Sequence, residues 1–125
     1  MSLFSKYISI NTMYKEINYN SIKIKESKTI RNAMIILNKN EERFLLVINQ
    51  ENKFLGTITD GDIRRAIIKG ISIDKSVKFC MNKKPVIAKE SNKNYEKLFA
   101  RMPSTIKFLP VIDKNKKIKT VLLDN

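Results

Sequence analysis

The chain repeats itself at an offset of 64 residues, and this periodicity constrains its fold more than any other feature. At that offset the apolar run 44–48 falls on 108–112 without a gap. The same register, in places with a one-residue gap, relates a further set of short matches: Asn18 with Asn82, Lys25-Glu26-Ser27 with Lys89-Glu90-Ser91, Lys53 with Lys117, Asp60 with Asp124, and Ile8-Ser9-Ile10-Asn11 with Ile71-Ser72-Ile73-Asp74. We predict an N-terminal tail over 1–7, a first repeat over 8–70 and a second over 71–125.

The apolar pattern of each copy predicts the order strand, helix, strand, strand, helix. The predicted elements are short strands at 21–25 and 85–89, helices at 29–39 and 92–102, hairpins at 44–48/53–59 and 108–112/117–123, and a helix at 60–69. Pro103 stops the second helix, and Gly70 closes the last one at a left-handed position. The predicted class is α/β (α+β), with two units packed sheet to sheet about a pseudo-twofold axis, because each unit exposes an apolar sheet face.

The composition excludes several kinds of site. There is one cysteine, Cys80, and no histidine, so an internal disulfide, a His/Cys zinc site and a Ser-His or Cys-His catalytic pair are all excluded. No phosphate-cradling glycine-rich loop is present, which argues against an independent enzyme. No apolar run is long enough for a signal peptide or a membrane span, so we expect a cytoplasmic protein without a metal or a required cofactor.

The formal net charge of +13, with a pI near 9.9, attracts anions such as nucleotides, sugar phosphates or nucleic acid. A compositional bias toward Lys, Asn and Ile explains the same charge without any anionic partner. The lysines are spread along the chain instead of forming one run, which makes nucleic-acid binding the less favoured reading.

One segment carries a family resemblance. The string 56–65, Gly-Thr-Ile-Thr-Asp-Gly-Asp-Ile-Arg-Arg, resembles the signature of cystathionine-β-synthase (CBS) repeats, and the repeated layout extends the resemblance over nearly the full length. With 69–71 and 81–86 it is similar to the CBS pair, or Bateman module, that precedes bacterial sugar-phosphate nucleotidyltransferase domains. The register also places Asn125 opposite Gly61, so we expect a fragment that is truncated before the last helix of its second repeat.

The resemblance implies a regulatory module that binds an adenine nucleotide such as AMP, ADP or ATP, and that modulates an attached enzyme domain. It also implies a homodimer. The implied ligand-binding residues are Thr57, Thr59, Asp62, Pro85, Val86, Ile87, Phe108, Leu109 and Pro110, with possible phosphate contacts from Arg64, Arg65 and Lys84. Binding in the cleft between the repeats would place ribose and phosphate at Thr59 and Asp62, and the base against the other repeat.

Physical chemistry gives reasons for these roles and also alternatives. A strand-to-helix junction with free N–H groups is a weak anion site, a carboxylate there accepts ribose hydroxyls, and Gly61 lets the backbone turn and approach a ligand. The spacing Thr59-x-x-Asp62 equally fits a helix cap with no ligand. Phe44, Leu45, Phe108 and Leu109 equally fit plain core, Cys80 a small buried side chain, and Lys83-Lys84 a solvated pair.

The pseudo-symmetric second site is predicted to be degenerate. Leu123 stands where the first copy has Thr59, and a leucine cannot hydrogen-bond a phosphate. The remaining contributors would be Ser21, Ile22, Phe44 and Leu45. A module that binds no ligand and serves as a dimerisation scaffold for an attached enzyme is therefore the main alternative, with nucleic-acid binding third.

Overall fold

The computed structural model describes residues 14–102 and 107–124. They form two compact units: the first unit is Tyr19–Pro85, and the second unit joins the segment ending at Asn18 to the segment beginning at Val86. The predicted tail, the match at 8–11, the helix stop at Pro103 and the position of Asn125 lie outside the described residues. Each unit is described by itself below.

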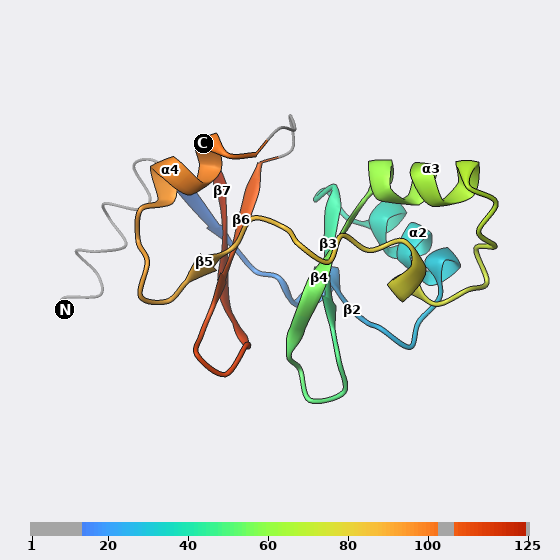
Figure 1. The fold of residues 1–125 in the computed structure, drawn as a ribbon, viewed down its shortest axis with the longest axis horizontal. Helices are drawn as coiled ribbons and strands as arrows, with labels where there is room; N and C mark the ends of the chain where they lie inside the picture. The colour runs from blue at the N-terminus through green and yellow to red at the C-terminus, as the bar shows by residue number, and fades with distance from the viewer. Residues whose placement is uncertain (1–13, 103–106, 125) are drawn as a thin grey trace. The chain divides into compact units, whose positions relative to one another are not determined.

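The first unit is a three-stranded sheet with two helices (Figure 1). Its order is β2-β3-β4, with β2 parallel to β3 and β4 antiparallel to it. The elements are η1 (Asn20–Ile22), β2 (Lys23–Lys25), α2 (Ile30–Lys39), β3 (Phe44–Ile48), β4 (Phe54–Thr59), α3 (Asp60–Ile68) and η2 (Val77–Phe79). All five residues of β3 are buried, as expected for a continuous apolar run at the centre of a sheet.

Helix α3 ends as its sequence predicts. Gly70 has φ of 84°, and its N–H donates to the carbonyl of Ile67 while that of Ile71 donates to Ala66, which is a Schellman arrangement. The helix is one residue shorter than the predicted 60–69 because Lys69 is its C-cap. No helix within the described segments is long and apolar enough to cross a membrane.

The second unit repeats this layout and adds a strand. Its sheet has the order β1-β7-β6-β5, formed by β1 (Tyr14–Ile17), β5 (Ala88–Lys89), β6 (Phe108–Ile112) and β7 (Ile118–Asp124), and α4 (Tyr95–Ala100) packs against it. The Tyr14 ring stacks on Phe99 at 4.9 Å between centroids and meets Tyr95 edge-on at 5.9 Å. These rings close one end of the core, so β1 is an integral strand of this unit.

Backbone hydrogen bonds confirm the 64-residue repeat. Both hairpins have a bulge at equivalent places, after Val47 and after Val111. Both have a left-handed turn residue, Asn52 with φ of 63° and Lys116 with φ of 65°. At the start of each turn a side-chain oxygen, Oδ1 of Asn49 or of Asp113, accepts two backbone N–H groups. The fold class is therefore the predicted mixed α+β fold, with two related strand–helix–strand–strand motifs.

Several predicted boundaries shift for local reasons. The strand predicted at 21–25 starts at Lys23, because residues 20–22 form a 3-10 turn, and that predicted at 85–89 has strand pairing only at 88–89. The helix predicted at 92–102 covers only Tyr95–Ala100, because Asn94 caps it: its Oδ1 accepts the N–H of Lys97. The repeat boundaries 8–70 and 71–125 follow the sequence register and stay a prediction.

Strand β1 was not predicted, and its pairing is non-local. It pairs antiparallel with β7, with Tyr14 opposite Asp124 and Ile17 opposite Val121. In the first unit the corresponding edge of β4 is covered by an isolated bridge between Thr57 and Asn82, with N–H···O distances of 3.0 and 2.7 Å. Asn18, which follows β1, is the register equivalent of Asn82, so in both units a segment that precedes the first strand of a repeated motif, β2 or β5, covers an equivalent strand edge.

The close approach at Asn82 requires glycine at position 56. A Cβ on Gly56 would overlap the Asn82 carbonyl oxygen, a backbone atom that cannot move without breaking the Thr57–Asn82 bridge. We predict that Gly56→Ala lowers the free energy of unfolding by about 1–3 kcal/mol, the usual cost of overpacking.

Urea unfolding followed by circular dichroism measures this change. Gly61→Ala is the matched control, because the nearest neighbours of a Cβ there are atoms at the end of the Arg65 side chain and not backbone atoms. Equal stability of the two variants would show that the Thr57–Asn82 approach is not tight.

Candidate functional site: the junction of β4 and α3

Thr59 and Asp62 form a reciprocal helix cap. The Thr59 N–H and hydroxyl both donate to Asp62 Oδ2, at 2.9 and 3.0 Å, and the Asp62 N–H donates to Thr59 Oγ1 at 3.4 Å. This is a capping box with Asp in place of the usual Glu or Gln. The capping role predicted from the spacing is therefore confirmed, and it fixes the carboxylate against the last residue of β4.

Helix α2 carries the same cap without a charge. Thr29 N–H and hydroxyl donate to Asn32 Oδ1 at 3.1 and 2.9 Å, and the Asn32 N–H donates back to Thr29 Oγ1 at 3.1 Å. An amide oxygen thus caps an equivalent helix in the same unit. Capping alone does not require the carboxylate at position 62.

The junction is acidic, which corrects the expectation of a weak anion site. The N–H groups of Thr59 and Asp62 are bonded within the cap, and Asp60 and Asp62 both lie in the first turn of α3. Carboxylates at this end stabilise the helix dipole and would repel a phosphate placed there. The geometry favours a ligand hydroxyl as hydrogen-bond donor to Asp62, with any phosphate held by cationic side chains.

The expectation that Gly61 lets the backbone turn was wrong. Gly61 lies inside α3, and Gly70 is the described glycine with positive φ. The missing side chain of Gly61 leaves room for the guanidinium of Arg65, whose Nη2 donates to Asp62 Oδ1 at 2.9 Å. Asp62 is 14% exposed at its side chain and Arg65 is 63% exposed, so the ion pair lies at the surface.

Two further residues adjoin the junction in the first unit. Thr57 is 2% exposed and lies two residues before Thr59, so the two side chains emerge on the same face of β4. Cys80 is buried; burial and then the negative charge of Asp62 raise the pKa of its thiol to about 11. Sequence reasoning had assigned Cys80 to packing alone and gave no signal that it lies within the field of Asp62.

The other predicted site residues divide between the two units. In the first unit Pro85 is half-buried and Arg64 and Lys84 are exposed. In the second unit Leu109 and Pro110 are buried in β6, whereas Val86, Ile87 and Phe108 are half-buried. The structure thus brings together Thr57, Thr59, Asp62 and Arg65, and it places a separate apolar group in the other unit.

The predicted degenerate second site contains no equivalent cap. Leu123, half-buried in β7, pairs with Phe108, and the described chain ends at Asp124. Its other expected contributors differ in exposure: Ser21 is exposed, whereas Ile22, Phe44 and Leu45 are buried. Nothing in this set supplies a carboxylate fixed as Asp62 is.

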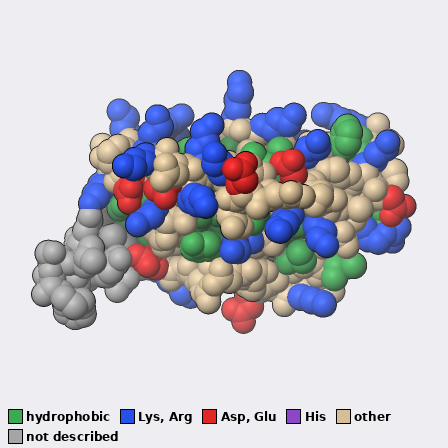
Figure 2. Space-filling view, turned by 90° about the horizontal axis from the view of Figure 1, so that it is seen from below, with side chains coloured by type: hydrophobic (Ala, Val, Ile, Leu, Met, Phe, Trp, Pro, Cys, Tyr) green, Lys and Arg blue, Asp and Glu red, His purple; other side chains and the backbone are tan. Residues whose placement is uncertain are grey.

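Charge and metal chemistry add little to the site. Lys and Arg side chains are spread over the face shown in Figure 2, with acidic side chains between them. Among the described residues no three or more His, Cys, Asp or Glu side chains are grouped to hold a metal ion. The junction therefore holds two carboxylates, Asp62 paired with Arg65 at 2.9 Å and Asp60 paired with Arg43 at 3.7 Å.

Sequence comparison relates part of the chain to known proteins. Residues 15–69 match the CBS domain family. An uncharacterized protein of Helicobacter pylori is 29% identical over 69% of this chain, and a homoserine O-acetyltransferase of Methanococcus vannielii is 29% identical over 90% of it. The chain spans 24% and 23% of the lengths of these relatives, about a quarter of each.

Structure comparison gives the fold. A CBS domain protein of Streptococcus pneumoniae matches with a TM-score of 0.71 and 16% identity, covering 100% of this chain and 86% of the other. A CBS domain protein of Pyrobaculum aerophilum, solved with AMP, matches at 0.67 and 19% over 82% and 79%. The CbpB protein of Listeria monocytogenes, solved with c-di-AMP, matches at 0.70 and 19% over 89% and 86%. Residues 15–69 are therefore similar in sequence to the CBS domain family, and the chain shares the fold of solved CBS-domain proteins.

Proposed function

We propose that this chain is a regulatory module that binds an adenine nucleotide beside Asp62 and catalyses no reaction itself. The observation that carries the proposal is the carboxylate of Asp62, fixed by two hydrogen bonds from Thr59 where the equivalent cap of α2 uses an amide. Besides stabilising the dipole of α3, a carboxylate accepts stronger hydrogen bonds from ligand hydroxyls than an amide oxygen does. AMP and c-di-AMP, found with two proteins of the same fold, share an adenosine unit and support this ligand class.

Carboxylate chemistry suits the ribose. An ionised carboxylate accepts hydrogen bonds and donates none, so it pairs with vicinal hydroxyls and disfavours a phosphate. The Thr59 hydroxyl donates a hydrogen bond to Asp62, and its Oγ1 can still accept one from a ligand. Arg64, Arg65 and Lys84 are exposed cations of the same unit and are the proposed phosphate contacts.

The base would be held by apolar surface. Pro85 in the first unit and Val86, Ile87, Phe108, Leu109 and Pro110 in the second are the proposed contributors. The half-buried ones, Pro85, Val86, Ile87 and Phe108, keep side-chain surface for a planar ring, and Leu109 and Pro110 are better suited to contact through backbone groups. This part of the proposal requires the two units to face each other about a pseudo-twofold axis.

The regulated activity is proposed to lie elsewhere in a longer chain. The relatives are about four times the length of this chain, which leaves room for an attached enzyme domain. The resemblance of residues 56–65 and 81–86 supports a sugar-phosphate nucleotidyltransferase as that domain. Regulation then requires that the nucleotide bind two states of the whole protein with different affinity.

Asp62→Asn is the sharpest test of the site. It copies the Thr29/Asn32 cap of α2 and so keeps the fold, while it removes the charge. We expect AMP affinity to fall at least about tenfold, the scale of one hydrogen bond to a charged group. Titration calorimetry with AMP measures this, and an affinity within twofold of the unchanged protein would defeat the assignment of Asp62.

The thiol of Cys80 reports whether the Asp62→Asn protein is folded with its charge removed. Burial and the Asp62 carboxylate raise the Cys80 pKa to about 11, so removing the carboxylate should lower it while burial keeps it above its ordinary value. Iodoacetamide alkylation followed over pH 8–12 should therefore show an earlier midpoint in the variant. An unchanged midpoint would place Asp62 too far from Cys80 to act on it.

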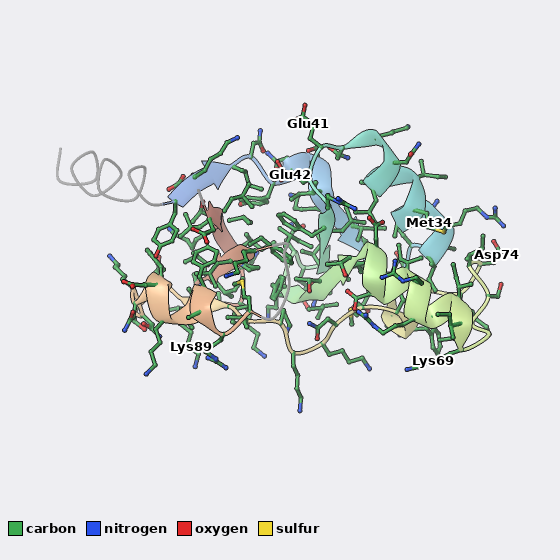
Figure 3. The ribbon with its side chains drawn as sticks, turned by 90° about the horizontal axis from the view of Figure 1, so that it is seen from above. Met34, Glu41, Glu42, Lys69, Asp74 and Lys89 are labelled. Carbon is green, nitrogen blue, oxygen red and sulfur yellow. The ribbon has the colours of Figure 1, made fainter. Side chains whose placement is uncertain are left out.

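An exposed apolar surface favours a second candidate function, that of a dimerisation scaffold. Met34 and Ile35 on α2, Ile67 and Ile68 on α3, and Phe79 in η2 are all exposed, and Ile68 is 77% exposed. Met34 is labelled on α2 in Figure 3, and Lys69 marks the end of α3. Large apolar groups on surface helices commonly mark an interface, and the proposed occupant is a second copy of this chain.

Ile68→Asp tests the scaffold function. In a homodimer joined through these helices, the new carboxylate would be desolvated at the interface, and we expect the protein to become monomeric in sedimentation velocity. Gln50→Asp, an exposed change at the β3–β4 turn, is the charge-matched control and should leave the dimer intact. Equal sedimentation of both variants would exclude this surface as the dimer interface.

A further inference from the structure

The guanidinium of Arg65 occupies one acceptor position on Oδ1 of Asp62. The guanidinium lies over the first turn of α3, where a Cβ on Gly61 would come within 3.2 Å of Nη1 and 3.3 Å of Nη2. Nη2 donates to Asp62 Oδ1 at 2.9 Å. Two independent features, the glycine at 61 and the acid at 62, thus place the guanidinium at this point.

Counting acceptor sites shows what a ligand would meet. Oδ2 already accepts two hydrogen bonds from Thr59, whereas the bond that Oδ1 accepts comes from Arg65. Each carboxylate oxygen offers about two acceptor sites. One acceptor site on Oδ1 is therefore left for a single ribose hydroxyl, and a pair of hydroxyls at Oδ1 needs Arg65 to leave this atom.

We propose, on the basis of the nucleotide-binding function above, that Arg65 is a specificity-determining residue that selects phosphorylated ligands over free nucleosides. A nucleoside that takes Oδ1 leaves the guanidinium without its partner. A nucleoside phosphate supplies a new anionic partner for the same guanidinium. With a nucleoside phosphate, Arg65 exchanges the Asp62 carboxylate for the ligand phosphate. With a ligand that has no phosphate, Arg65 loses its ion pair with Asp62 and gains no other anion.

The corresponding cap of α2, formed by Thr29 and Asn32, supports the link between the Asp62 carboxylate and the Arg65 cation. Its acceptor is Asn32, and the residue three positions later, equivalent to Arg65, is Ile35. The cation is therefore found where the carboxylate is found and is missing where an amide serves. Arg31 on α2 is exposed like Arg65 and pairs with Asp74, with 3.1 Å between Nε and Oδ1, so it provides a control of equal charge outside the proposed site.

The test compares AMP with adenosine by titration calorimetry on the unchanged protein, Arg65→Ala, Arg65→Lys and Arg31→Ala. In Arg65→Ala we expect adenosine to bind up to about twofold tighter, because an exposed ion pair of this spacing is weak. We expect AMP to bind at least about tenfold weaker, because a charge-assisted hydrogen bond to phosphate is lost. Arg65→Lys should recover part of the AMP affinity, and Arg31→Ala should leave the ratio of the two affinities within about twofold.

The outcomes separate the two proposals. If the unchanged protein binds neither ligand, the nucleotide-binding function fails and this inference fails with it. If it binds AMP but Arg65→Ala changes the AMP and adenosine affinities by the same factor, or Arg31→Ala changes their ratio as much, the inference fails alone.

A second measurement follows the exchange directly. Side-chain ¹⁵N NMR of Arg65 should show a restrained guanidinium in the free protein that becomes mobile in Asp62→Asn. Adding AMP to the unchanged protein should leave it restrained with shifted signals. A guanidinium already mobile in the free protein would overturn the proposal.

Discussion

The outer edge of the second hairpin strand is the constraint on which both sheets depend. An uncovered strand edge exposes unpaired N–H and C=O groups. In the first unit the edge of β4 is met at Thr57 by Asn82, and in the second unit β1 pairs with β7 from Val121 to Asp124. Asn82 and the register-equivalent Asn18, which follows β1, each precede the first strand of a strand–helix–strand–strand motif, β5 and β2 respectively. Neither motif therefore covers the outer edge of its own hairpin, and a segment outside the motif supplies that cover.

Local signals explain which parts of the fold could be predicted. The strands at 44–48 and 108–112 were predicted to the residue, because each is an unbroken apolar run that ends in a turn capped by Asn49 or Asp113. Strand β1 could not be predicted, because its stabilising partners lie more than a hundred residues away in β7. Its central residues Lys15 and Glu16 are exposed and charged, so no apolar pattern marks it.

The candidate site was predictable to a similar extent. The spacing of Thr59 and Asp62 predicted the cap, and the structure confirms it; the ligand contact stays a prediction. The ion pair of Asp62 with Arg65 has a local signal in its three-residue spacing, but its geometry depends on the space left above Gly61. The proximity of Cys80 to Asp62 depends on how the chain returns after α3, and nothing in the sequence around Cys80 encodes that return.

The two repeats share a hairpin backbone but differ in the side chains at the candidate site. The residues that fix the hairpin turn are not the residues that form the Thr59/Asp62 cap. The hairpin turn is preserved when Asn49 becomes Asp113 and Asn52 becomes Lys116, since either side chain supplies the acceptor and either backbone adopts the left-handed conformation. Thr59 and its counterpart Leu123 both pair correctly within their hairpins, with Phe44 and Phe108, so strand pairing does not select between them. A hydroxyl that fixes a carboxylate is thus an addition to the fold and not a requirement of it. The charge at Asp62 already interacts with the dipole of α3 and with the guanidinium of Arg65, and the hydroxyl donors of the proposed ligand would be its third partner.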